Sequence, residues 1–174
     1  MKETLYKFLN KDGSACNGGK GKWPLPKRGR PGAWLHVEGE LKPCSNGLHL
    51  VRVSGLLDWL GPALYRVADY ELEGAIEKDS NVLVVRAARL GPRIRAYNDR
   101  TLRLFACWCV RETPLADGRK VWDLLTDERS RQVVEIAEPY ARGKISKGKL
   151  AAAKDAAGDA ARAAARAAQD NQFA

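Results

Sequence analysis

The turn from Cys44 to His49 holds the chain's most distinctive group of reactive side chains, in the order Cys-Ser-Asn-Gly-Leu-His. Ser, Asn and Gly form turns readily, and the apolar residues that follow predict a strand. Histidine exchanges protons near neutral pH through two distinct ring nitrogens, so His49 is a candidate catalytic residue at the mouth of a sheet, with the Cys44 thiol nearby. The other interpretation is that His49 is structural and held by hydrogen bonds.

A second group of candidate residues lies in the Gly- and Pro-rich segment 13–32, where the composition predicts a long loop. Its cations are interleaved with a tryptophan, a mixture suited to phosphate contacts and to stacking on an exposed base. The candidate nucleic-acid-binding residues are Lys20, Lys22, Trp23, Lys27, Arg28 and Arg30, together with Arg93 and Arg95 beyond the predicted sheet. The segment therefore predicts a site for nucleic acid or another polyanion; the alternative is a loop that only contributes solubility.

Known catalytic and metal-binding motifs do not accompany these residues. The sequence has no Gly-x-x-x-x-Gly-Lys-Ser/Thr phosphate loop, no Gly-x-Ser-x-Gly elbow and no His-Glu-x-x-His helix. Its four cysteines lack a regular spacing, and Cys107 and Cys109 would point apart on a helix. We expect reduced thiols, no metal site and no cofactor.

Several short motifs follow one another along the chain in a recognisable order. They are Tyr6-Lys7-Phe8, Cys44-x-x-Gly47-Leu48-His49, Trp59-Leu60-Gly61-Pro62, Leu64-Tyr65-x-Val67, Val84-Val85-Arg86, Leu102-x-Leu104-Phe105-Ala106-Cys107 and an alanine-rich tail. Over residues 4 to 170 this order resembles a family of uncharacterised proteins scattered through bacteriophages and bacteria, which carries no assigned activity.

The layout of strand, histidine turn, short helix and strand is also similar to small ADP-ribosyltransferase-type folds. Those enzymes bind NAD in a cleft between two sheets and use a histidine, a tyrosine and a strand-end glutamate. The similarity implies an NAD-using transferase with His49 in the cleft, and it offers Tyr65 and Glu112 for the other two roles.

Charge and length narrow the class of protein further. The 174 residues carry a formal net charge of +9, and residues 1–35 hold eight lysines and arginines against two acids. No apolar run approaches the roughly 18 residues that a membrane span needs, and the first residues lack the apolar stretch of a secretory signal. We therefore expect no membrane association and a cytoplasmic location.

The predicted elements are those of an α+β protein with a mostly antiparallel sheet. Strands are expected at 4–9, 33–37, 47–53, 63–72 and 81–90, and helices near 56–60, 100–111, 127–142 and 147–169. The helix at 100–111 is expected to be buried. We expect a core domain over residues 1–143 and an alanine-rich helical tail over residues 144–174.

The tail has high helix propensity but few large side chains to bury. It either lies against the domain, pairs with a copy of itself or a host protein through residues 147–169, or is a solvated tail. The sequence thus predicts a small phage-type accessory protein that binds an anionic partner, foremost nucleic acid, through its basic N-terminal loop. The NAD-using transferase and a module that self-associates through the alanine-rich helix are the alternatives.

Overall fold

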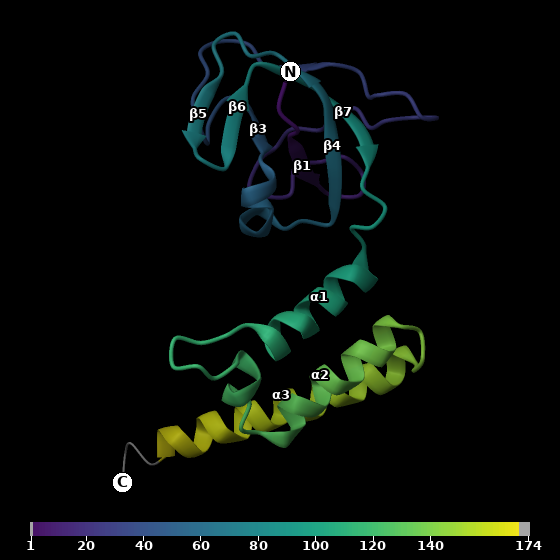
Figure 1. Ribbon diagram of the computed structural model, residues 1–174, viewed down its shortest axis with the longest axis vertical. Coiled ribbons are helices and arrows are strands. Elements are labelled where there is room, and N and C mark those ends of the chain that lie inside the picture. Colours follow the sequence, from purple (N-terminus) through teal and green to yellow (C-terminus); the bar gives the residue numbers. More distant parts are fainter. Residues whose placement is uncertain (1, 171–174) are drawn as a thin grey trace. The chain divides into compact units, whose positions relative to one another are not determined.

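The computed structural model describes residues 2–170, with side chains as far as residue 159, and divides into two compact units, Met1–Tyr97 and Asn98–Ala174 (Figure 1). The predicted α+β class is confirmed, because the first unit contains a seven-stranded sheet and the second is built of helices. The units divide at Tyr97, whereas the sequence placed a boundary at residue 143. The difference arises because the alanine-rich helix packs against the helix before it.

The first unit is an antiparallel sheet with the strand order β2-β7-β4-β1-β3-β6-β5. Its strands are β1 (Tyr6–Leu9), β2 (Leu35–His36), β3 (Leu48–Val51), β4 (Ala63–Tyr70), β5 (Ile76–Asp79), β6 (Val82–Val85) and β7 (Ala87–Arg93). A 3₁₀ helix, η1 (Val53–Trp59), stands where the sequence predicted a short helix near 56–60. All of the strand pairs in this sheet are antiparallel, so the predicted antiparallel sheet is confirmed.

The stretch 81–90, predicted as one strand, forms two strands that pair with different neighbours. β6 pairs with β3 and β5, whereas β7 pairs with β2 and β4. The break falls at Arg86, whose Nη1 donates to the carbonyl of Gly39 at 2.6 Å. A continuous apolar run predicts extended backbone but does not show where the chain changes partner. β5 was not predicted, because its charged, exposed residues are typical of a sheet edge.

β1 runs through the core of the first unit, and while Phe8 is buried on one of its faces, the other face contacts the main core cluster. Leu5 and Leu9 on this face are fully buried. Since side chains alternate along a strand, Lys7 lies on the same inward face between them. The cluster that surrounds this face includes Leu48, Leu50, Tyr65, Val67, Leu83, Val85 and Leu90.

The second unit contains α1 (Asp99–Glu112), the short 3₁₀ helix η2 (Val121–Leu124), α2 (Glu128–Ala141) and α3 (Lys147–Asp170). Two helices begin at side-chain caps: Asn98 accepts a hydrogen bond from the Thr101 amide, and Asp127 accepts one from the Ser130 amide. The caps and the apolar spacing explain why helices were predicted here.

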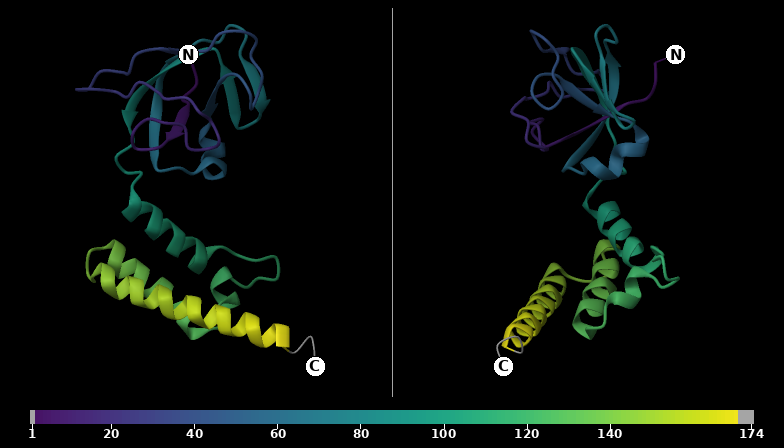
Figure 2. Two further views of the ribbon diagram at one scale, coloured as in Figure 1. Left: turned by 180° about the vertical axis from the view of Figure 1, so that it is seen from behind. Right: turned by 90° about the vertical axis from the view of Figure 1, so that its left-hand side faces the viewer.

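The helices of the second unit pack around a small core of Cys107, Ala137 and Leu150. The prediction that α1 is buried is wrong, because Trp108 is 57% exposed and Cys107 is the helix's one buried residue. α3 lies beside α2 in the views of Figures 1 and 2, and Leu150 and Ala153 are its buried contacts within the described side chains. Across the described residues, every helix is too short or too polar to cross a membrane.

The core of the first unit gives a direct stability prediction. Leu50 is 0% exposed, so Leu50→Ala should lower the free energy of unfolding by about 2 to 5 kcal/mol through lost burial and a new cavity. The matched control is Leu57→Ala, since Leu57 is 64% exposed and its truncation should change stability by less than about 0.5 kcal/mol. Urea unfolding, followed by NMR signals of the strand amides, measures both variants. Equal effects would contradict this description of the core.

Candidate functional site

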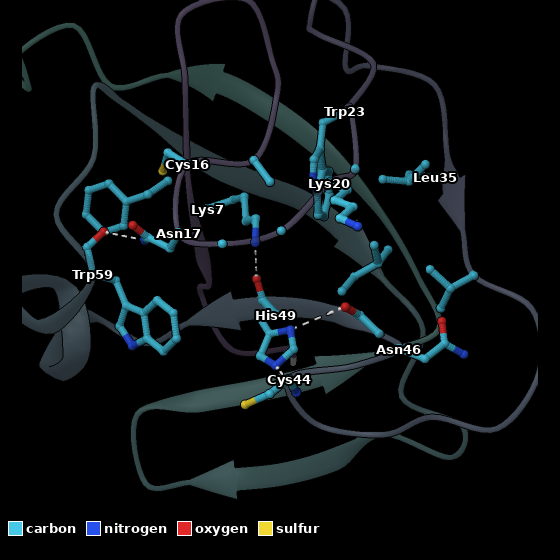
Figure 3. Close-up of a pocket in the computed structure, with 18 of the residues that line it drawn as sticks. Lys7, Cys16, Asn17, Lys20, Trp23, Leu35, Cys44, Asn46, His49 and Trp59 are labelled. Atoms are coloured by element: carbon cyan, nitrogen blue, oxygen red, sulfur yellow. Dashed lines mark hydrogen bonds between the residues drawn. The ribbon is translucent and has the colours of Figure 1, made fainter.

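The first half of the loop 13–32 covers part of the sheet and closes a pocket of about 500 Å³. The walls come from β1, β2, β3, η1, the turn 44–47 and the loop itself (Figure 3). The side chains in these walls that could bind a ligand or take part in chemistry are Lys7, Cys16, Lys20, Trp23, Cys44 and His49. The structure thus brings three of the sequence-predicted residues, Lys20, Trp23 and His49, to one site.

The loop is held against the sheet by contacts along its length. Trp23 is 4% exposed and belongs to the core cluster. Nearer the start of the loop, the Asn17 Nδ2 donates to the carbonyl of Trp59 at 3.3 Å, and the Cys16 sulfur sits where a side chain at position 61 would meet it. The expectation that Trp23 stacks on an exposed base needs correction, because its indole is packed in the core and anchors the loop there.

Among the pocket residues, Lys7 has the most unusual surroundings for a charged side chain. Its Nζ donates to the His49 carbonyl at 2.9 Å and lies 5.4 Å from the centre of the Trp23 ring (Figure 3). Burial lowers the pKa of Lys7 to about 8, with a small opposing effect from Cys16. Among the described side chains, no carboxylate lies within 4 Å of this ammonium group.

The imidazole of His49 is engaged on both sides by its own turn. Its Nε2 accepts a hydrogen bond from the Cys44 amide at 3.0 Å, so the ring proton resides on Nδ1, which faces the Gly47 carbonyl at 3.3 Å. Cys44 adopts a left-handed backbone with φ of 65°, and the ring stabilises that strained residue. Burial and then the charge of Lys7 lower the pKa of His49. This geometry favours the structural interpretation of His49.

Gly47 is required within the same turn. Its φ is +148°, and a Cβ placed there would come within 2.3 Å of the Val84 side chain on β6. The turn can therefore pack against the sheet only with glycine at this position.

The second half of the loop forms a tight hairpin outside the pocket. Lys27 and Arg30 exchange two backbone hydrogen bonds, of 3.2 and 2.9 Å, around Arg28 and Gly29. Arg28 has φ of 49° and Gly29 has φ of 75°, the pattern of a type I′ turn. The three cations of this "27–30 hairpin" are exposed, and none of them has an ion-pair partner among the described side chains.

The remaining predicted cations lie away from the pocket. Lys22 is exposed and 3.8 Å from the Asp12 carboxylate. Arg93 ends β7, and Arg95 follows it in the connection to the second unit. Both of these arginines are exposed, and neither lines the pocket.

The residues implied by the ADP-ribosyltransferase resemblance are not arranged as that resemblance requires. Tyr65 is buried in the core, and Glu112 belongs to the second unit, where its carboxylate pairs with Lys120 at 2.6 Å. The described strands form one sheet, not two sheets around a cleft. Nothing in this geometry therefore favours the transferase.

Sequence reasoning missed Lys7, Cys16, Asn17 and Trp59 as site residues. A signal for Lys7 was present, because it alternates with Leu5 and Leu9, and a lysine on the inward face of a strand is unusual. No local signal marks the other three, which reach the pocket through long-range packing.

Comparison of the chain with protein-family models, with curated proteins and with solved structures finds no match. Within the described residues, the side chains of His, Cys, Asp and Glu form no group of three that could hold a metal ion, and all four thiols are free.

The His49 geometry predicts a pH dependence of stability. Its pKa is lower in the folded than in the unfolded chain, so the unfolded chain binds more protons as the pH drops below about 6.5, and the free energy of unfolding falls there. His49→Gln should flatten this fall. The matched control is His36→Gln, at the exposed second histidine, which should retain it. Urea unfolding across about pH 5 to 8 measures both; equal profiles for the two variants would refute the assignment.

Proposed function

We propose that the first unit binds a polyanion, foremost nucleic acid, through the 27–30 hairpin. The observation that carries this proposal is the exposure of three cations within four residues, without carboxylate partners among the described side chains. Cations gathered in this way contact phosphates and release counterions, which is the main source of affinity in sequence-independent binding.

The backbone of the hairpin supports a role for Arg28. A type I′ turn favours Asn or Gly at its first central position, because both tolerate positive φ at little cost. Arginine is disfavoured in that conformation, and strained residues of this kind concentrate at functional sites. The turn therefore gives up some stability to place a guanidinium at its tip.

The structure narrows the basic surface that the sequence predicted. Lys2 pairs with Asp69 at 2.7 Å, Lys22 lies near Asp12, and Lys7 is half-buried in the pocket. The exposed cations of the loop that remain without an ion pair in the described structure are Lys20, Lys27, Arg28 and Arg30. Because Trp23 does not offer its ring, binding should depend on phosphates and show little preference among bases.

A charge-removal variant tests the proposal. The triple variant Lys27→Gln, Arg28→Asn, Arg30→Gln keeps a residue that tolerates positive φ at the turn. It should weaken binding of labelled single-stranded and duplex oligonucleotides and reduce the slope of log affinity against log salt by about 2 to 3, one phosphate contact for each lost cation. Fluorescence anisotropy between about 50 and 200 mM salt measures the slope.

The matched control removes three exposed cations from the second unit, by Lys144→Gln, Lys147→Gln and Lys149→Gln. This control changes the net charge by the same amount, so its salt slope should stay close to that of the wild type. If both triple variants lose affinity equally, net charge and not the hairpin is responsible. Absence of binding by the wild type at about 50 mM salt would also end the proposal.

A further inference from the structure

The pocket beneath the loop 13–32 has an unbalanced charge. Its twenty lining residues include two lysines, Lys7 and Lys20, and no aspartate or glutamate. Lys20 is exposed at the rim, whereas Lys7 is on the inward face of β1. The pocket therefore offers an inner and an outer cation to whatever enters it.

Lys7 is a half-buried cation whose ammonium group is partly withdrawn from water and has no anionic partner among the described side chains. Its hydrogen-bond acceptor is a neutral group, the His49 carbonyl, and the Trp23 ring lies beside it. Withdrawing an ammonium group from water is costly unless it is paired, so a lysine whose ammonium group is partly desolvated and unpaired weakens the fold. An anion bound in the pocket would offset this cost.

The other titratable groups near Lys7 do not supply that anion. Burial raises the pKa of the Cys16 thiol, an effect that the charge of Lys7 only partly opposes, so the thiol is neutral near pH 7. His49 is neutral, as its two ring hydrogen bonds require. Cys44 lies at the exposed end of the turn, and Tyr65 is the β4 residue that pairs with Lys7 in the sheet.

The walls determine what kind of anion fits. Much of the lining is apolar or aromatic, from Phe8, Trp23, Leu35, Val37, Leu48 and Trp59. The volume of about 500 Å³ is within the range of pockets that hold small organic molecules. A free inorganic ion would leave most of these walls without a contact.

We propose that this pocket binds a small organic anion, with its aromatic body against the partly exposed apolar side chains of the wall, such as Trp59, and its anionic group on the Lys7 ammonium. The site is separate from the 27–30 hairpin, none of whose residues lines the pocket. Phosphate, carboxylate and sulfonate groups share the required chemistry, since each accepts charge-assisted hydrogen bonds from an ammonium group.

Two fluorescent probes with nearly the same ring system test the role of the charge. Anilinonaphthalene sulfonate is an aromatic anion, and N-phenylnaphthylamine is its uncharged analogue. The wild-type chain should bind the sulfonate with a defined stoichiometry of one. Lys7→Met should weaken sulfonate binding by about ten- to a hundredfold, the range for a hydrogen bond to a charged group, and leave binding of the uncharged probe nearly unchanged.

The pH dependence gives a second readout. Sulfonate affinity should be highest where Lys7 is charged and fall as the pH rises through about 8, because the ammonium loses its proton there. The sulfonate itself does not titrate in this range. The Lys7→Met chain retains Cys16, Lys20, Cys44, His49 and Tyr65, so a fall that persists in this variant would assign the effect to those groups and overturn the proposal.

Two further variants separate charge from folding and from the hairpin. Lys7→Arg keeps a cation and should keep most of the preference for the sulfonate. The hairpin triple variant should bind the sulfonate like the wild type although it loses oligonucleotide binding, so that failure of one proposal is distinguishable from failure of the other. Equal affinity of the wild type and Lys7→Met for the sulfonate, with both chains folded by circular dichroism, refutes the proposed site.

Discussion

Burial of the Trp23 indole fixes the course of the loop 13–32, and much of the rest of the first unit follows from it. Backbone pairing within this Gly- and Pro-rich segment is confined to isolated bridges, such as those of Ser14 with Lys22 and Lys27 with Arg30, so an apolar anchor in the core is what holds it on the sheet. With Trp23 in place, the residues before it cover the sheet and close the pocket, while the residues after it emerge as the 27–30 hairpin. The Trp23 side chain thus divides the loop into an inner segment that lines the pocket and an outer segment that forms the hairpin.

The basic charge of the first 35 residues is correspondingly divided into three environments. Some cations are matched to carboxylates, as Lys2 is to Asp69. One, Lys7, is half-buried in the pocket, where partial loss of water lowers the pKa of its ammonium group. The others are exposed to solvent, where a charge is well solvated and remains accessible to a partner. Cations of the same formal charge therefore differ in whether they are free to contact a partner.

The turn at Cys44 to His49 connects the pocket to the sheet. The imidazole holds the left-handed Cys44 backbone, and the carbonyl of the same histidine receives the Lys7 ammonium. The residue that looked most like a catalytic group in the sequence thus supports the pocket wall, and its backbone oxygen, not its ring, contacts the Lys7 ammonium group.

Local signals in the sequence determined the α+β class, most strand positions, the helix capped by Asp127 and the absence of regular structure in the loop. Each depends on residues close together in the chain: alternating apolar side chains, capping groups, and clusters of Gly and Pro. Only the tertiary structure decided that 81–90 breaks at Arg86, that Trp23 is buried, and that Lys7 meets His49 in a pocket. These outcomes depend on contacts between segments distant in sequence, and whether a lysine is solvated, paired or buried is settled by the neighbours that folding brings to it.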